Sequence, residues 1–450
     1  MNISEDAFNS SITNKFLGKV DRKLYFDKVI DKNAFRKTVF TALTNNTYFP
    51  KTPSLVLSCN KDKGVLRFVP ILSREDNIVY SFCISEIDEF LTSNKVEGTY
   101  GGWQMSCAMR NKEKEELDEA VAAENPSPCS NTFNRNAYIE QFGEFNSRIK
   151  GLSHFAEDNN LSVVTLDIAN YYNRIRLDLL EDNIRGVVPI EKKEVVNCLM
   201  FFLRNWDRSI NSFSPQSVGI PQEYFGDCSR ILANFYLQPY DAAMKRYTES
   251  IGGRYFRFAD DQVLFVPKGV EEKIVSYASS QLMPLGLDIN VSKVCVFENV
   301  ASYFEYKGVS ILDELVPGIK MAEQPIEHVE KLIQSFVSID RKNLLKNGSH
   351  IFKTIIHLGL ERIDTKIRDI VFDILMNEYL YLDFDERMAK ELKKALSKPQ
   401  WQEFTKKYSN SIKRETQSIR RFNALKNKTL INEKEFSWLE TDVILGVKDI

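Results

Sequence analysis

Two adjacent carboxylates, Asp260 and Asp261, stand between two apolar runs, and their type and spacing suggest chemistry. The flanking runs are typical of strands, so residues 255–266 predict a β-hairpin that carries both acids at its turn. A hard cation such as Mg²⁺ takes oxygen ligands and often uses only one or two protein carboxylates, which leaves places for substrate phosphates. The alternative is an ordinary surface hairpin, because Asp is common in turns.

A third acid, Asp167, ends the β-branched apolar run at residues 163–166 and precedes a helix-like stretch with two tyrosines. Carboxylates from two separate strands can hold a pair of cations about 3.5–4 Å apart, the arrangement used for in-line phosphoryl transfer. The alternative is that Asp167 caps the helix that follows it, since Asp is a favoured N-cap residue.

The stretch between these acids predicts a loop followed by a core helix. Gly219 and Pro221 interrupt the chain, and from Tyr224 to Leu237 apolar and small residues recur at helical spacing. By itself this pattern indicates packing and carries no chemistry.

Taken in order, the motifs resemble those of a reverse transcriptase, over about residues 55–310. The matching segments are 61–70 (the fingers hairpin), 167–172 (the first catalytic palm motif), 219–241 (the template and nucleotide motif), 258–261 (the second catalytic motif), 285–293 (the palm motif ending in lysine) and 303–309 (the primer-grip hairpin). The chain departs from the family pattern at Glu223, where Gly is common, and at Phe258, where Tyr is commoner.

The resemblance implies an α+β fold: right-hand polymerase fingers and palm, followed by an α-helical thumb-like C-terminal domain. The implied domains are residues 1–160 for the N-terminal helices and fingers, residues 161–315 for the palm with its catalytic motifs, and residues 323–450 for the thumb-like domain.

Hydrophobic periodicity adds a coarse prediction of secondary structure. Apolar residues at helical spacing predict helices over residues 1–50, 135–160 and 323–450. Residues 53–90 are predicted to be rich in strands, with a turn at 61–64.

The resemblance also implies roles at the catalytic centre. Asp167 and Asp260 are expected to bind two Mg²⁺ ions, with the backbone carbonyl of Ile168 helping and Asp261 adjoining the site. Lys293 is expected to protonate the leaving pyrophosphate, although a lysine that only extends its charge to solvent is an open alternative.

Five further residues are expected to bind the incoming nucleotide. Lys61, Lys63 and Arg67 are candidates for holding the triphosphate, and Arg67 matches the family best. Tyr172 occupies the sugar-gate position, where a ring would collide with a ribose 2′-hydroxyl, and Gln222 would contact the nucleotide or the template. The alternative for the three basic residues is a solvated hairpin, and the alternative for Tyr172 is a tyrosine packed in the core.

The implied function is an RNA-directed DNA polymerase that adds dNTPs to a 3′-hydroxyl or a protein hydroxyl, either RNA-templated or untemplated. The long segment before Asp167 and the helical C-terminus resemble bacterial anti-phage reverse transcriptases of the abortive-infection and unknown-group type. One alternative is a palm-fold RNA-dependent RNA polymerase, against which Tyr172 argues. The other is a catalytically silent nucleic-acid-binding scaffold, against which the three acids argue.

Composition fits an intracellular multidomain protein. The chain has 450 residues, 43% of them hydrophobic, which is enough for two or three cores. Its 7 cysteines form no Cys-x-x-Cys pair, so a reduced cytoplasmic setting is expected. Residues 1–20 are polar with mixed charge, which predicts no signal peptide, and no apolar run is long enough to predict a membrane span.

A basic segment at residues 393–428 predicts a nucleic-acid interface despite the net charge of −2. It holds eleven basic and two acidic residues with four aromatics interleaved, a mixture that suits single-stranded or structured nucleic acid. Lys413, Arg414, Arg420 and Arg421 are the candidate contacts; a solvated helical face with inward aromatics is the alternative. Expected partners are dNTPs and RNA or single-stranded DNA, including an associated non-coding RNA; self-association and a second defence protein stay open.

Overall fold

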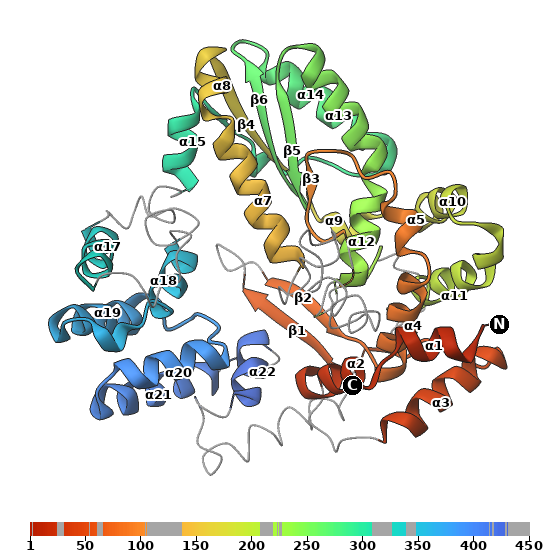
Figure 1. The fold of residues 1–450 in the computed structure, drawn as a ribbon, viewed down its shortest axis with the longest axis horizontal. Helices are drawn as coiled ribbons and strands as arrows, with labels where there is room; N and C mark the ends of the chain where they lie inside the picture. The colour runs from red at the N-terminus through yellow and green to blue at the C-terminus, as the bar shows by residue number, and fades with distance from the viewer. Residues whose placement is uncertain are drawn as a thin grey trace, which may run out of the picture. The chain divides into compact units, whose positions relative to one another are not determined.

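The computed structural model describes residues 1, 3–24, 31–53, 55–60, 66–103, 105, 137–207, 219–222, 224, 227–307, 326–338, 348–413, 415, 418–427 and 430. They belong to two compact units of a mixed, mainly helical α+β chain (Figure 1). The first unit comprises Met1–Ser54 and Pro70–Val300, and the second comprises Leu55–Val69 and Ala301–Ile450. The three-domain division expected from the sequence stays a prediction.

The first unit is organised around a five-stranded sheet with the strand order β3-β5-β6-β4-β7. The strands are β3 (Thr99–Tyr100), β4 (Leu161–Asp167), β5 (Arg254–Phe258), β6 (Asp261–Pro267) and β7 (Cys295–Phe297). β5 and β6 form an antiparallel hairpin, β4 runs antiparallel to both β6 and β7, and β3 runs parallel to β5. The hairpin predicted over 255–266 and the strand predicted to end at Asp167 are both confirmed.

Helices cover both faces of this sheet (Figure 1). They are α7 (Ala137–Gly151) and α8 (Ser153–Asp158) on one side, and α13 (Gln238–Ser250) and α14 (Glu271–Leu282) on the other. The side chains of β5 alternate between these layers, as the period of two in a strand requires. The ring of Phe258 packs 5.0 Å from that of Phe142 in α7, whereas Arg257 pairs with Asp241 in α13.

The remaining regular elements in the described part of the first unit are helices. Its other helices are α1 (Glu5–Ser11), α2 (Asn14–Leu24), α3 (Lys32–Thr44), α4 (Arg74–Ser85), α5 (Asp88–Thr92), α9 (Tyr171–Arg174), α10 (Leu177–Val187), α11 (Lys193–Leu203) and α12 (Asp227–Tyr236), with 3₁₀ turns at Ile190–Lys192, Met283–Leu285 and Val291–Lys293. The helices predicted within residues 1–50 and 135–160 are confirmed.

The prediction that residues 53–90 are rich in strands is wrong beyond residue 71, where α4 and α5 follow. Ser73 caps α4 by accepting a hydrogen bond from the Asp76 backbone N–H at 3.0 Å. Residues 76–84 are all buried, so α4 has no polar face. A helix that is buried on every side lacks the 3.6-residue hydrophobic period by which helices are recognised in a sequence.

The second unit has a strand pair and a helical bundle. Among the described residues its elements are β1 (Leu55–Asn60), most of β2 (Leu66–Ile71), nearly all of α15 (Val300–Lys307), α17 (Ile326–Ser338), α18 (Gly348–Ile356), a 3₁₀ turn at Leu360–Arg362, α19 (Thr365–Glu378), α20 (Glu386–Ala395), α21 (Lys398–Lys413) and α22 (Ile419–Lys426). An isolated bridge pairs Ser58 of β1 with Ser418, the N-cap of α22. The described part of 323–450 is helical, as predicted.

The primer-grip hairpin expected at 303–309 is not formed by the described residues of that segment. They belong to the helix α15 (Val300–Lys307), while residues 308 and 309 lie outside the described residues. Val300 and Tyr303 are both buried and lie three positions apart, which is the spacing of one helical face.

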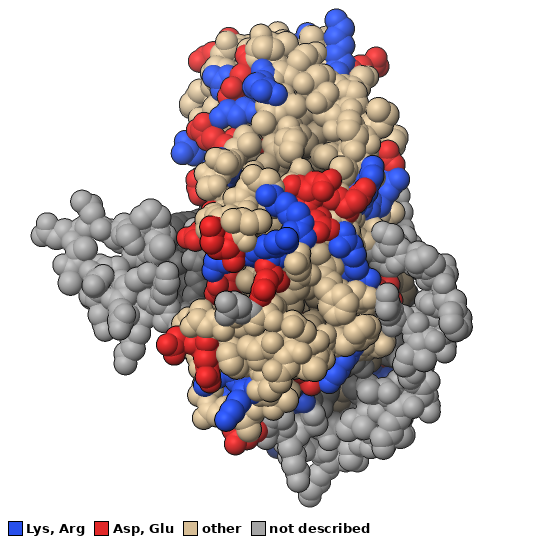
Figure 2. All heavy atoms as spheres, turned by 90° about the vertical axis from the view of Figure 1, so that its right-hand side faces the viewer, with Lys and Arg blue, Asp and Glu red and all other residues tan. Residues whose placement is uncertain are grey.

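Charged side chains of both signs are intermixed on the molecular face drawn in Figure 2. None of the helices in the described part of the chain is long and apolar enough to cross a membrane.

Candidate active site

Three carboxylates lie near one another where β4 ends and the β5–β6 hairpin turns. Asp167, the last residue of β4, is paired in register with Asp261, the first residue of β6. Residues directly opposite each other in an antiparallel pair project from the same face, so these two side chains are neighbours. Asp260 precedes Asp261 in the turn of the hairpin, and the structure therefore brings all three predicted acids together.

The turn that carries Asp260 has an unusual backbone. Phe258 pairs with Asp261, so the loop between β5 and β6 consists of Ala259 and Asp260 alone. Ala259 has a φ of 54°, a left-handed conformation that is unfavourable for a residue with a Cβ atom. The Ala259 backbone N–H donates to the carbonyl of Tyr100 at 3.1 Å, which anchors the turn to β3.

Asp167 is held by a loop that is distant in sequence. Its carboxylate accepts hydrogen bonds from Asn290 Nδ2 at 2.9 Å and from Lys293 Nζ at 2.5 Å, and its side chain is only 5% exposed. The cap of α9 is Asn170, so Asp167 does not serve as the N-cap considered from the sequence. Asp167 instead connects the end of β4 to the segment that ends in Lys293.

Ile168 lies beside this contact in an isolated antiparallel bridge with Ile289. The hydrogen bonds of that bridge run from the Asn290 N–H to the Asp167 carbonyl and from the Ala169 N–H to the Asp288 carbonyl. The Ile168 side chain is buried and apolar, so the backbone carbonyl is the group of this residue that could bind a metal ion.

The electrostatics of the cluster follow from its crowding. Burial, followed by the negative charges of Asp261 and Asp167, raises the pKa of Asp260 to about 6. Burial acts to lower the pKa of Lys293, but its hydrogen bond to Asp167 and the charges of the three acids outweigh that effect and raise it. Lys293 thus supplies positive charge to a site that otherwise concentrates negative charge.

The donor set is chemically suited to a hard divalent cation, because it consists of carboxylate oxygens whose mutual repulsion such a cation would relieve. Within the described residues, no three His, Cys, Asp or Glu side chains already converge on one point. Asp167 is turned toward Lys293 and Asn290. Asn290 and Lys293 thus take one carboxylate oxygen of Asp167 each.

Two of the predicted nucleotide contacts lie in segments that touch each other. Tyr172 is half-buried in α9, with its ring 5.5 Å from that of Tyr171, and its carbonyl accepts from the Ile220 N–H at 3.1 Å. A Cβ atom on Gly219 would lie 2.1 Å from the Tyr172 carbonyl oxygen, so this approach requires glycine. Gln222, two residues beyond Ile220, is partly exposed.

The predicted triphosphate contacts belong to the second unit. Arg67 is exposed on β2, and Lys61 and Lys63 lie outside the described residues. Their role stays a prediction.

The placement of Arg420 and Arg421 does not support the nucleic-acid contact expected of them. Both are buried, with 6% and 4% of their surface exposed. The Arg420 guanidinium pairs with Glu415 at 2.8 Å and donates to the Leu380 carbonyl at 2.9 Å, while Arg421 Nη1 donates to the Glu415 carbonyl at 3.3 Å. These guanidinium groups tie α22 into the helical unit.

The aromatic residues of the basic segment agree with the alternative of a solvated helical face. Phe404, Tyr408 and Phe422 are buried, as expected for a solvated helical face with inward aromatics. Lys413 is the last residue of α21, and Arg414 lies outside the described residues.

Sequence reasoning missed the residues that hold the site. Asn290 is one, and the others are Arg257, Asp241 and Asn234, which form a buried polar network behind the hairpin. One signal was available, because Arg257 is a cation inside the aromatic strand sequence Tyr-Phe-Arg-Phe. A charge at an inward position of a buried strand indicates a buried partner.

No family model matches this chain, and no curated protein matches it. Among solved structures it is similar to the structure of apo telomerase from Candida tropicalis, with 10% sequence identity and a TM-score of 0.35 over 92% of this chain and 73% of that chain.

Proposed function

We propose that this chain is a nucleotidyltransferase of the polymerase type, which joins a nucleotide to a hydroxyl group with release of pyrophosphate. The observation that carries the proposal is the register of Asp167 against Asp261, with Asp260 beside them in the turn. Packing alone gives no reason to gather three carboxylates at the ends of two central strands, whereas divalent cations and a triphosphate do.

In this proposal Asp167 and Asp260 would hold two Mg²⁺ ions, with the Ile168 carbonyl and Asp261 adjoining. When bound, the two cations would activate the attacking hydroxyl and stabilise the charge on the leaving pyrophosphate. The three acids would position the cations at the hairpin turn. Because Asp167 is buried and Asp260 is partly buried, the electrostatic interactions there would be less weakened by water.

Lys293 would have one role before the cations bind and another after they bind. Before the cations bind, it neutralises Asp167 through the ion pair at 2.5 Å. If Asp167 turned to bound cations instead, the Lys293 ammonium group would be free to donate a proton to pyrophosphate.

We further propose that the nucleotide is a deoxynucleotide and that the template, where one is used, is RNA. Tyr172 supports the first point, because it lies five residues after Asp167, at the sequence position that the sugar gate has in the reverse-transcriptase resemblance. The order of the motifs between residues 61 and 309, which resembles that of reverse transcriptases, supports an RNA template. Gln222 would contact the nucleotide or the template, and Lys61, Lys63 and Arg67 would hold the triphosphate.

The decisive experiment supplies purified protein with Mg²⁺ and labelled dNTPs or NTPs in separate reactions, with and without an RNA template and primer. The proposal predicts incorporation of dNTPs that is lost in the double variant Asp260→Ala, Asp261→Ala, while circular dichroism shows an intact fold. The reciprocal preference for NTPs would assign an RNA polymerase. Binding of nucleic acid without any incorporation would indicate a silent scaffold.

The biological role that we propose is anti-phage defence, based on the architectural resemblance to abortive-infection and unknown-group reverse transcriptases. Bacteria that express the wild-type chain should reduce the plating efficiency of a sensitive phage, and bacteria that express the Asp260→Ala, Asp261→Ala variant at the same level should not. Equal protection by both proteins would separate defence from catalysis.

A further inference from the structure

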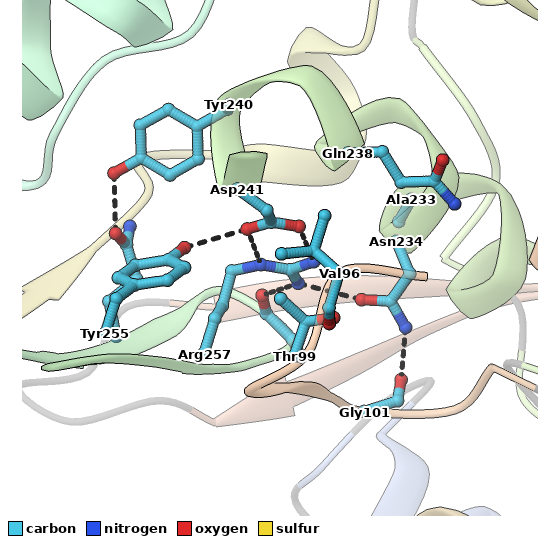
Figure 3. A network of polar contacts seen from close by, with 12 residues as sticks. Val96, Thr99, Gly101, Ala233, Asn234, Gln238, Tyr240, Asp241, Tyr255 and Arg257 are labelled. Atoms are coloured by element: carbon cyan, nitrogen blue, oxygen red, sulfur yellow. Dashed lines mark hydrogen bonds and ion pairs between the residues drawn. The ribbon is translucent and has the colours of Figure 1, made fainter. Parts of the chain in front are cut away.

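A buried polar network lies directly behind the hairpin turn that carries Asp260 (Figure 3). At its centre are Arg257 of β5 and Asp241 of α13, both completely buried. Arg257 Nε and Nη2 donate to the two carboxylate oxygens of Asp241 at 2.7 and 2.6 Å, which makes the pair bidentate. Tyr255 adds a hydrogen bond from its hydroxyl to Asp241 at 2.8 Å.

Stability alone gives a weak reason for this ion pair. Removing two charges from water is costly, and apolar residues of similar volume often replace a buried pair without loss of stability. A bidentate pair does fix the direction of the guanidinium plane. Arg257 is thereby held with its third nitrogen, Nη1, facing away from Asp241.

That nitrogen reaches the turn. Arg257 Nη1 donates to the Ala259 carbonyl at 2.6 Å and to Asn234 Oδ1 at 2.8 Å. Asn234, from α12, in turn donates from Nδ2 to the Gly101 carbonyl at 2.9 Å. The network therefore links the helix layer, the turn and the glycine that follows β3.

Hydrogen bonds hold both the carbonyl and the N–H of Ala259. Its carbonyl accepts from Arg257, and its N–H donates to the Tyr100 carbonyl at 3.1 Å. Ala259 holds a φ of 54°, a conformation that persists in a non-glycine residue only where its surroundings impose it. A Cβ atom on Gly101 would lie 2.6 Å from the Ala259 nitrogen, which shows how closely β3 supports the turn.

We propose that Arg257, oriented by Asp241 and Asn234, is a positioning residue that fixes the strained turn and thereby aims the Asp260 carboxylate at the cation site. This inference rests on the proposed function for the identity of the ligand. It assigns Arg257 no contact with substrate.

The test uses the full-length chain and three variants. Arg257→Lys keeps the charge but cannot hold Asp241 and the turn at once, because an ammonium group lacks the planar fork. Asn234→Ala keeps the ion pair and removes the link to Gly101. Tyr255→Phe is the matched control, because it removes a hydrogen bond to Asp241 on the side away from the turn.

Two measurements decide the proposal, and neither needs enzymatic activity. The first is hydrogen–deuterium exchange of the peptide at residues 256–264 without divalent cations. The second is the dissociation constant for Mg²⁺ by calorimetric titration. Loss of a residue that orients a metal ligand typically weakens metal binding by about 10- to 100-fold. We expect that range for Arg257→Lys and Asn234→Ala, with turn exchange faster by about tenfold or more.

Tyr255→Phe should lower the melting temperature and leave both measurements at their wild-type values. The proposal is overturned if Arg257→Lys and Asn234→Ala match wild type in both measurements, or if Tyr255→Phe changes them as much. If Arg257→Lys does not fold, Asn234→Ala decides. Should the wild-type chain fail to bind Mg²⁺ or to incorporate nucleotides, the proposed function fails, and the exchange data still judge whether the network holds the turn.

Discussion

The ammonium group of Lys293 lies 2.5 Å from a carboxylate oxygen of Asp167, so a residue expected to protonate pyrophosphate holds a residue expected to bind metal. Asn290 secures the other oxygen of Asp167 at 2.9 Å. A positive side chain and a divalent cation would therefore compete for one carboxylate. Under the proposed function, the effect of Lys293 on cation binding can therefore be measured separately from its effect on turnover.

Replacing Lys293 with Met should change metal binding and turnover in opposite directions. Mg²⁺ should bind up to about fivefold more tightly, because the lost competitor is a half-exposed ion pair that contributes at most about 1 kcal/mol. Nucleotide incorporation at saturating Mg²⁺ should fall by about 10²- to 10⁴-fold, the usual range for loss of a general acid. Calorimetry and single-turnover kinetics measure the two effects. Lys273→Met, at an exposed position of α14, is the control. Unchanged turnover would show that Lys293 only forms the ion pair with Asp167 and is not a general acid.

The raised pKa of Asp260 predicts an unusual dependence of stability on pH in the absence of metal. Burial and the charges of Asp261 and Asp167 raise this pKa to about 6. Between about pH 4 and about pH 6 the folded chain keeps a proton on Asp260 that an unfolded chain has released. The free energy of unfolding should therefore fall as pH rises through that window.

Urea denaturation in EDTA at several pH values measures this dependence. The difference between wild type and Asp260→Asn isolates it from other titrating groups, and Asp158→Asn at the exposed end of α8 is the control. Added Mg²⁺ should reverse the trend for wild type, since it stabilises the charged carboxylate. A difference that does not vary with pH would show that Asp260 is ionised as readily in the folded chain as in the unfolded one.

Removing the ring of Tyr172 should relax the choice of sugar. In Tyr172→Ala, the ratio of kcat/KM for NTPs to that for dNTPs should rise roughly tenfold or more, because the ring no longer excludes a 2′-hydroxyl. Tyr171→Phe is the matched control, since Tyr171 is buried and its hydroxyl bonds to the Ala233 carbonyl. A ratio equal to that of wild type would assign Tyr172 to packing.

Arg420 should behave as a structural residue. Arg420→Gln breaks its ion pair with Glu415 and its bond to the Leu380 carbonyl, and it should lower the free energy of unfolding by about 2–4 kcal/mol. Lys406→Gln, at an exposed position of α21, should stay within about 0.5 kcal/mol of wild type. Denaturant titration followed by circular dichroism measures both. A stable Arg420→Gln variant that binds nucleic acid more weakly would instead support the nucleic-acid interface expected from the sequence.

The sequence by itself determined the local parts of the site. The apolar runs on either side of Asp260 and Asp261 specified the hairpin, and the β-branched run specified the strand that ends at Asp167. These features depend on neighbours in the chain, so propensity and pattern were enough.

Patterns were insufficient where packing decides which way a side chain points. The basic segment was visible as composition, yet Arg420 and Arg421 are turned inward because their helix docks on that side. Residues 76–84 were misread because burial on every side removed the helical period.

Only the tertiary structure decided how the acids are held. The partners of Asp167 lie 123 and 126 positions away in the chain, and the contact from Asn234 to Gly101 spans 133 positions. The left-handed backbone of Ala259 runs against its own local preference. Contacts across such separations arise from the packing of whole elements, which no local pattern of residues encodes.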